Sequence, residues 1–188
     1  MKQMITMVAA LAVLAVSGGL YLHASGGNQV AQAGAQNARV NLRDAANARV
    51  GIVRLIEFNG DVTVRATTRG LAPGFHGFHI HSIGICEAPF TSAGGHFNMP
   101  GNTHPGHSGD MPVLLIKADG TGEAHISTDR FGINNLFDAD GSAIIIHAGP
   151  DNYANIPTRY SATGPDEATQ NTGDAGARIA CGVISGGG

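Results

Sequence analysis

The chain has 188 residues, a length that suits one domain with residues to spare at the N-terminus. Its formal net charge of −3 gives no reason to expect nucleic acid as a partner. With 28 glycines, no tryptophan and only 13% charged residues, the composition favours short strands joined by many turns over long helices.

The first 33 residues are typical of an export signal. A short basic start, Met1-Lys2-Gln3, precedes an apolar run from Met4 to Leu22, and Ala31-Gln32-Ala33 offers a cleavage point. This layout predicts a secretory signal peptide over residues 1–33. The apolar run is also nearly long enough to cross a bilayer, so an uncleaved membrane anchor is the alternative. Either way we expect an exported domain, in the periplasm, the cell envelope or the medium, that contacts no membrane unless this segment stays attached.

The rest of the chain predicts a short linker at residues 34–38 and one all-β domain over 39–188. Val50, Ile52, Ile56 and Phe58 share one parity, which indicates a strand, and Asn59-Gly60 then predicts a tight hairpin turn. Further strands are predicted over residues 62–67, 76–81, 113–116, 123–127, 143–147 and 178–184. Short strands separated by turns predict a sandwich or barrel, and its long loop at 148–177 is a place where function is expected.

Histidines are concentrated in the stretch from His76 to Asp110, which holds six of the nine in the chain. His79 and His81 are two residues apart, so a strand would place both imidazoles on one face. A loop rich in glycine, proline and asparagine then carries further residues of ligand type, namely His96, His104, His107 and Asp110. A lone histidine is often structural, but so many at ligand spacings predict a metal site.

The chain has two cysteines, Cys86 and Cys181. Because an exported protein meets an oxidising compartment, we expect them to form a disulfide rather than to stay as free thiols. Closing a loop of this length would stabilise the fold by roughly 4 to 5 kcal/mol.

Five motifs resemble, in order, those of the copper/zinc superoxide dismutases. They are Gly77-Phe78-His79-Ile80-His81, Gly95-His96-Phe97-Asn98, His107-Ser108-Gly109-Asp110, Ile146-His147 and the stretch from Gly173 to Ile184. The resemblance covers about residues 39–184. It implies an eight-stranded Greek-key β-barrel with two long functional loops, and an enzyme that uses copper and zinc to disproportionate superoxide to dioxygen and hydrogen peroxide.

The resemblance also implies a role for each matching residue. The copper ligands would be His79, His81, His96 and His147, and the zinc ligands would be His96, His104, His107 and Asp110. His96 would therefore bridge the two metals, release copper on its reduction and take up a proton. Supporting roles would fall to Arg178, which would orient the anionic substrate, to Asp151, which would link a copper-ligand and a zinc-ligand histidine, to the buried His76, and to the disulfide of Cys86 and Cys181.

One departure from the family pattern concerns zinc. Only Pro105-Gly106 separates His104 from His107, whereas most relatives have a longer segment there, so a copper-only dismutase is an alternative. A non-catalytic copper-binding module is a second alternative, although every copper ligand and the arginine are present. A zinc hydrolase is disfavoured, because the chain has no Gly-x-Ser-x-Gly motif. The sequence leaves open whether the protein is a monomer or a homodimer, and it gives His125 no role.

Overall fold

The computed structural model describes residues 36–99 and 101–187, so the predicted signal peptide or anchor lies outside the described residues. No helix within these ranges is long and apolar enough to cross a membrane. The strands are β1 (Gln36–Asp44), β2 (Arg49–Phe58), β3 (Asp61–Thr68), β4 (Gly74–His76), β5 (Phe78–His81), β6 (Leu114–Ile116), β7 (Gly122–Thr128), β8 (Ala143–His147), β9 (Arg178–Val183) and β10 (Ser185–Gly186).

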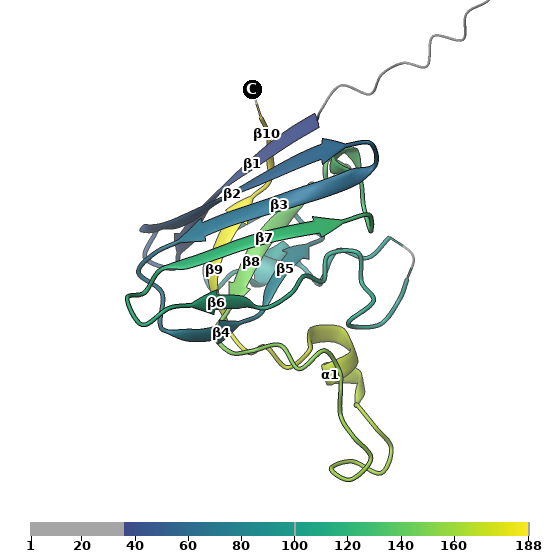
Figure 1. The fold of residues 1–188 in the computed structure, drawn as a ribbon. Helices are drawn as coiled ribbons and strands as arrows, with labels where there is room; N and C mark the ends of the chain where they lie inside the picture. Colours follow the sequence, from purple (N-terminus) through teal and green to yellow (C-terminus); the bar gives the residue numbers. More distant parts are fainter. Residues whose placement is uncertain (1–35, 100, 188) are drawn as a thin grey trace, which may run out of the picture. The chain divides into compact units, whose positions relative to one another are not determined.

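The strands form one antiparallel sheet that closes nearly into a barrel. Its order is β4-β6-β7-β3-β2-β1-β9-β8-β5, and β10 pairs with β1. The two edge strands, β4 and β5, are separated in the chain by Gly77 alone, so the chain itself joins the two edges. In Figure 1, β1, β2, β3 and β7 form the near layer, and β9, β8 and β5 run behind it. The predicted all-β barrel is confirmed, and its eight strands are recovered when β4 and β5 are counted as one and the two-residue β10 is left aside.

The core fills the space between these two layers. Alternate residues of the near layer, such as Val53, Leu55 and Val64, are buried in one cluster with Phe78 and Ile80 of β5 and with Ile144 and Ile146 of β8. Because side chains alternate across a strand, the residues between them face outward. Burying these apolar side chains supplies most of the free energy that holds the barrel together.

Two details near the N-terminal end differ from the sequence prediction. The first strand begins at Gln36, so residues 36–38, which were expected in the linker, pair within the sheet. In β2, Ile52, Ile56 and Phe58 lie on the same side of the strand, but this side does not face the core. The buried positions are Val53 and Leu55, on the other side. A register shift between β1 and β2, at Leu42/Arg43, lets the other end of β2 bury Val50 as well.

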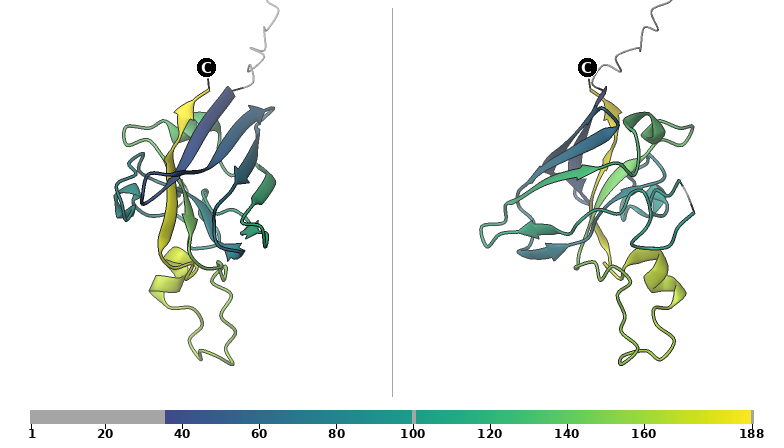
Figure 2. Two further views of the ribbon diagram at one scale, coloured as in Figure 1. Left: turned by 90° about the vertical axis from the view of Figure 1, so that its left-hand side faces the viewer. Right: turned by 45° about the vertical axis from the view of Figure 1, so that its right-hand side comes forward.

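The long loop over residues 148–177 contains one short helix that the sequence did not predict. Helix α1 (Glu167–Thr172) begins after Asp166, whose carboxylate accepts a hydrogen bond from the Thr169 backbone N–H at 2.9 Å. It ends at Gly173, which has the left-handed backbone conformation usual after a helix. The loop and α1 extend past one end of the barrel in all three views (Figures 1 and 2).

Candidate metal centre

Strand β5 carries the first two histidines of the site. Phe78 and Ile80 point into the barrel core, so His79 and His81 point to its outer side. The open edge of β5 is covered by the loop that holds the other ligand-type residues. Ile80 N–H donates to the Gly109 carbonyl at 2.9 Å, and Phe97 N–H donates to the Ile80 carbonyl at 2.8 Å. The same pairing sets Asp110 beside His79 and His96 beside His81.

Strand β8 brings the fourth histidine to this group. β8 is paired with β5 in regular register as far as Phe78 and Ile146. Between Ile146 and His147 the pairing with β9 shifts by one residue. Ile144 and Ile146 belong to the core, so alternation along β8 places His147 on the opposite, outer side. His147 therefore lies with the outward-facing imidazoles and not in the core.

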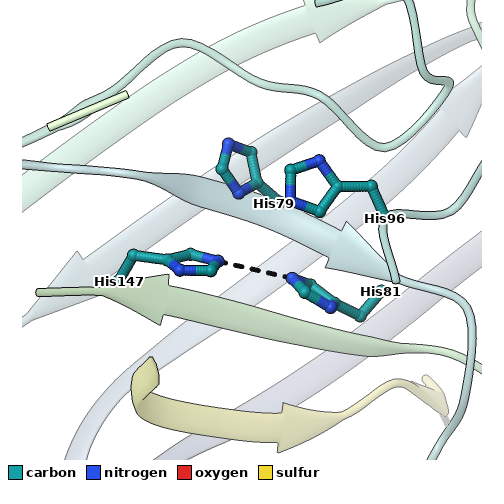
Figure 3. A group of neighbouring side chains, drawn as sticks. All are labelled: His79, His81, His96 and His147. Carbon is teal, nitrogen blue, oxygen red and sulfur yellow. Dashed lines mark hydrogen bonds between the residues drawn. The ribbon is translucent and has the colours of Figure 1, made fainter. Parts of the chain in front are cut away.

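Four imidazoles converge on one point, as Figure 3 shows for His79, His81, His96 and His147. One ligand atom from each lies within 4.8 Å of all the others. The ring centroids of His79 and His96 are 4.1 Å apart, and the Nε2 atoms of His81 and His147 are 3.4 Å apart. Four nitrogen donors at this spacing suit copper.

The rings in this group each have a second nitrogen that is engaged elsewhere. Nδ1 of His81 contacts the Gly94 carbonyl at 3.0 Å, and Nδ1 of His147 contacts the Gly176 carbonyl at 3.0 Å. In His79 the arrangement is reversed, because Nε2 contacts Asp151 and the buried Nδ1 has no hydrogen-bond partner. These contacts fix the orientation of each ring and decide which nitrogen is free for a metal.

A second group surrounds Asp110 and consists of His96, His104 and His107. Nδ1 of His96 lies 2.7 Å from Asp110 Oδ1, whereas Nδ1 of His104 and of His107 lie 3.0 and 3.3 Å from Oδ2. His96 is thus common to both groups. The short Pro105-Gly106 connection does not keep His104 and His107 apart, because their Nδ1 atoms approach the same carboxylate oxygen.

Asp151 links the two groups from behind. Its Oδ2 lies 2.7 Å from His79 Nε2, and its Oδ1 lies 2.7 Å from His104 Nε2. Oδ1 also accepts a hydrogen bond from the Tyr153 backbone N–H at 2.7 Å. Gly173, just after α1, packs so closely here that a Cβ at this position would collide with Asp151 Oδ1. His76 is buried nearby, with its ring nitrogens 2.7 Å from the His147 carbonyl and 2.9 Å from the Ala72 carbonyl.

Burial keeps three histidines of the first group, His79, His81 and His147, neutral. It lowers the pKa of His79, places that of His81 well below its usual value, and lowers that of His147 to about 4. A neutral imidazole is the form that binds a metal ion. At neutral pH these three side chains therefore need to lose no proton before they can act as ligands.

The second group is held by charge. Burial opposes protonation of His104, but the nearby Asp110 carboxylate and the hydrogen bond to Asp151 outweigh it and raise the pKa of His104 to about 9. For the two carboxyl groups burial acts in the opposite direction, yet hydrogen bonds from His104 and from His96 or His79 hold both pKa values well below their usual range. Asp110 and Asp151 are thus carboxylates at any physiological pH, which is the form in which a carboxyl group can bind a metal ion.

Arg178 lies at the mouth of the first group. A cavity of about 430 Å³ is lined by His81, His96, His147 and Arg178 together with residues at the end of α1 and just after it. The guanidinium of Arg178 donates to the carbonyls of Phe90 at 2.6 Å and of Gly94 at 2.5 Å. The Gly94 carbonyl therefore accepts a hydrogen bond from Arg178 and also contacts Nδ1 of His81. Cys86 and Cys181 form a disulfide with a Cα–Cα distance of 5.7 Å, which ties the segment that supplies these carbonyls to β9.

Sequence reasoning missed two side chains that support the second group. Arg130, just after β7, donates to the backbone carbonyls of Pro105, His107 and Asp110 at 3.0, 3.3 and 3.4 Å. Tyr153 stacks on His104 with ring planes 5° apart, and its hydroxyl accepts the Val113 backbone N–H at 2.9 Å. No local motif marks either residue, because both reach the site from outside the histidine-rich stretch.

The residues present fit the two metals that the fold implies. A tetrahedral zinc ion with bonds of about 2.0 to 2.1 Å holds its ligand atoms about 3.3 Å apart, which is close to the separations around Asp110. The Nδ1 atoms of His79, His104 and His107 are buried without a hydrogen-bond partner. Buried polar atoms rarely lack a partner, so each of these three nitrogens is suited to bind a metal ion.

Comparison with known proteins identifies the class. The sequence profile of the copper/zinc superoxide dismutase (SODC) family matches residues 49–184, and the chain belongs to this family. It is 44% identical to a "Superoxide dismutase [Cu-Zn]" from Mycolicibacterium paratuberculosis over 182 residues, which cover 87% of this chain and 80% of that one. A protein of the same name from Caulobacter vibrioides is 36% identical over 148 residues, 71% of this chain and 77% of that one.

Solved structures agree with this assignment. A superoxide dismutase-like protein from Bacillus subtilis matches with a TM-score of 0.65 and 30% identity, over 77% of this chain and 96% of that chain. The protein is thus a superoxide dismutase, an oxidoreductase that acts on superoxide, and its cofactors are copper and zinc. The predicted family, activity and cofactors are confirmed.

Proposed function

We propose specific roles in superoxide dismutation for the residues of the two groups. His79, His81, His96 and His147 bind copper, and His96, His104, His107 and Asp110 bind zinc, with His96 shared between them. The convergence of four imidazoles, of which only one also faces Asp110, is the observation that carries this proposal. Copper supplies the couple of two oxidation states through which one superoxide is oxidised and a second is reduced, while zinc is redox-silent.

The chain's own residues bind and orient the substrate. Superoxide is a small anion, and Arg178 lines the cavity beside His81 and His147. The overall charge is −3, so the local field of Arg178 must outweigh a repulsive global field. The carbonyls of Phe90 and Gly94 hold the guanidinium in place before the anion arrives, which lowers the entropic cost of binding.

His96 is the residue that holds the proton needed to form hydrogen peroxide. Its Nδ1 faces the Asp110 carboxylate, so its Nε2 is the atom that faces the copper group and can carry a proton toward the cavity. Asp151 holds His79 and His104 from behind and keeps the two groups in fixed relation. His76 braces the end of β8 through the His147 carbonyl.

The test of these roles is His96→Ala, with His125→Ala as the matched control on an exposed strand. Protein reconstituted with copper and zinc is assayed for metal content and for superoxide decay. We expect His96→Ala to retain bound copper, to lose zinc and to lose most of the activity, because one residue serves both groups. His125→Ala should match the wild type in metal content and in superoxide decay. Full activity of His96→Ala would overturn the shared role.

We also propose that the domain works outside the cytoplasm, after export directed by residues 1–33. The disulfide supports this, because such bonds persist in oxidising compartments. The folded domain follows a short linker and begins with β1 at Gln36. The intact mass of the purified protein distinguishes the two fates of the leader. Loss of about 33 residues indicates a cleaved signal, and a full-length chain in the membrane fraction indicates an anchor.

A further inference from the structure

A row of three arginines and one histidine crosses the outer face of the near layer. The register pairs Arg39 with Arg54, Arg54 with Arg65, and Arg65 with His125, so the four residues stand side by side on β1, β2, β3 and β7. These four strands lie next to one another in Figure 1. We call this row the arginine ladder. Neighbouring strands are about 4.8 Å apart, so the ladder presents a regular line of positive charge.

The ladder faces solvent and has no acidic partner. Its members alternate with buried residues such as Val40, Val53 and Val64, and all four are exposed. Within residues 36–99 and 101–187, every ion pair closer than 4.0 Å joins a histidine to an aspartate of the metal centre. The three guanidinium groups therefore form no ion pair, although Glu123, two residues before His125, shares the outer face of β7.

More positive charge adjoins the ladder. Arg43 is paired across the strands with Arg49, and Arg69 follows β3, so six of the nine arginines in the chain belong to this part of the sheet. A shallow hollow of about 260 Å³ lies between Arg49 and Arg69. Like charges placed directly opposite each other weaken a sheet. The fold therefore gains nothing from this arrangement, and an anionic partner is the simplest reason for it.

Apolar side chains on the same face narrow the choice of partner. Ile56 and Phe58 share the outward parity of Arg54 and are 36% and 62% exposed. They lie at the end of β2 that pairs with the start of β1, where the chain enters the domain from its apolar N-terminal run. Cations beside exposed apolar groups are typical of surfaces that rest on an anionic bilayer. A single-stranded nucleic acid is usually bound by aromatic side chains interleaved with the cations, whereas Arg39, Arg54 and Arg65 stand side by side with none between them.

We propose that the arginine ladder docks the domain on the surface of an anionic phospholipid membrane. The guanidinium groups contact lipid phosphates, and Phe58 enters the headgroup region. The metal centre lies on the other side of the core, because Phe78 and Ile80 point toward the near layer while His79 and His81 point away from it. Docking through the ladder thus leaves the cavity beside Arg178 open to solvent.

The test compares two double variants of the full chain with equal loss of charge. Arg54→Gln/Arg65→Gln removes the centre of the ladder, and Lys117→Gln/Arg159→Gln removes two exposed cations outside it. Cosedimentation is measured with vesicles of phosphatidylcholine alone and with 30% phosphatidylglycerol, at low and high salt. The wild type and both double variants share the apolar N-terminal run. Binding to the neutral vesicles therefore measures the contribution of that run. We expect the ladder variant to lose about fivefold in anionic binding per arginine, and the control to lose little.

Several outcomes would overturn the proposal. One is equal binding of the ladder variant and the wild type to anionic vesicles. Another is an equal loss of binding in both double variants, because binding would then depend only on the net charge of the protein. A third is binding to heparin together with binding to anionic vesicles that is no better than binding to neutral ones. That result would show that the ladder binds a soluble polyanion and not a membrane. Thermal unfolding checks the fold, and the ladder variant should unfold at the same or a higher temperature because a repulsive pair is removed.

Discussion

Arg178 is oriented before any substrate enters the cavity. Two main-chain carbonyls accept hydrogen bonds from its guanidinium, and although burial lowers its pKa, a guanidinium stays charged in proteins. A planar donor group held at two points cannot swing away to solvent, as a free surface arginine can. The positive charge therefore sits at a fixed place beside His81 and His147.

Arg178→Ala should keep both metals and slow the reaction with superoxide. The arginine lines the cavity but belongs to neither ligand group, so metal content should not change. Loss of the local field should lower the rate constant by roughly tenfold or more and weaken its dependence on ionic strength. Stopped-flow superoxide decay over a range of salt concentrations measures both effects. Arg159→Ala, in the same long loop, is the control, and an unchanged rate in Arg178→Ala at low salt would contradict the assignment.

The residue types at the metal centre could be predicted, but their ring orientations could not. His79 and His81 share a face because a strand alternates, and this follows from sequence alone. Which nitrogen each offers depends on distant partners, since Nε2 of His79 contacts Asp151 whereas Nδ1 of His81 contacts the Gly94 carbonyl. Such contacts arise only after residues 72 or 13 positions apart have been brought together by the fold.

At the scale of elements, loops rather than strands complete the centre. The barrel itself supplies three histidines from β5 and β8, and the loop over residues 95–110 supplies the rest. That loop contains no helix or strand of its own. It is held by its pairing with β5 and by Arg130, which reaches three of its carbonyls. The sequence predicted the strands from alternation, but it could not predict α1, whose six residues follow a proline-containing loop and show no helical period.

Arg130→Ala should loosen zinc and leave copper in place. The guanidinium joins the carbonyls of Pro105, His107 and Asp110, so its loss frees the segment that carries three of the proposed zinc ligands. Removal of supporting groups around a metal typically costs 10- to 100-fold in affinity. Transfer of zinc to a chromophoric chelator measures the effect. Arg130→Lys should recover part of the lost zinc affinity, and the control Lys117→Ala should lose no zinc affinity. Unchanged zinc release in Arg130→Ala would contradict this role.

At the scale of the whole molecule, the two layers of the barrel have different tasks. The far layer and its loops carry the metal centre, and the near layer carries the arginine ladder on its outer face. The net charge of −3 conceals this separation, because it sums a basic sheet face with acidic groups elsewhere. Composition thus predicted the fold class but not the distribution of charge, which depends on register. One residue of slip would turn Arg54 and Arg65 inward.

The disulfide joins two distant parts of the chain, both of which contact Arg178 or carry it. Cys86 and Cys181 are 95 residues apart in sequence, and the bond holds the segment that contains Phe90 and Gly94 against β9, where Arg178 begins the strand. The double variant Cys86→Ala/Cys181→Ala should therefore lose both stability and orientation of Arg178. Closing a loop of this length restricts the unfolded chain, which predicts a loss of about 4 to 5 kcal/mol in the free energy of unfolding.

Urea unfolding of the metal-free double variant and wild type gives this difference without the added stabilisation of bound metal. The remetallated double variant should also show a weaker salt dependence of superoxide decay, because Phe90 and Gly94 no longer hold the guanidinium of Arg178 at a fixed place. A variant that loses stability but keeps the wild-type salt dependence would separate the two roles and confine the disulfide to folding. A loss below about 1 kcal/mol would contradict the loop-closure argument itself.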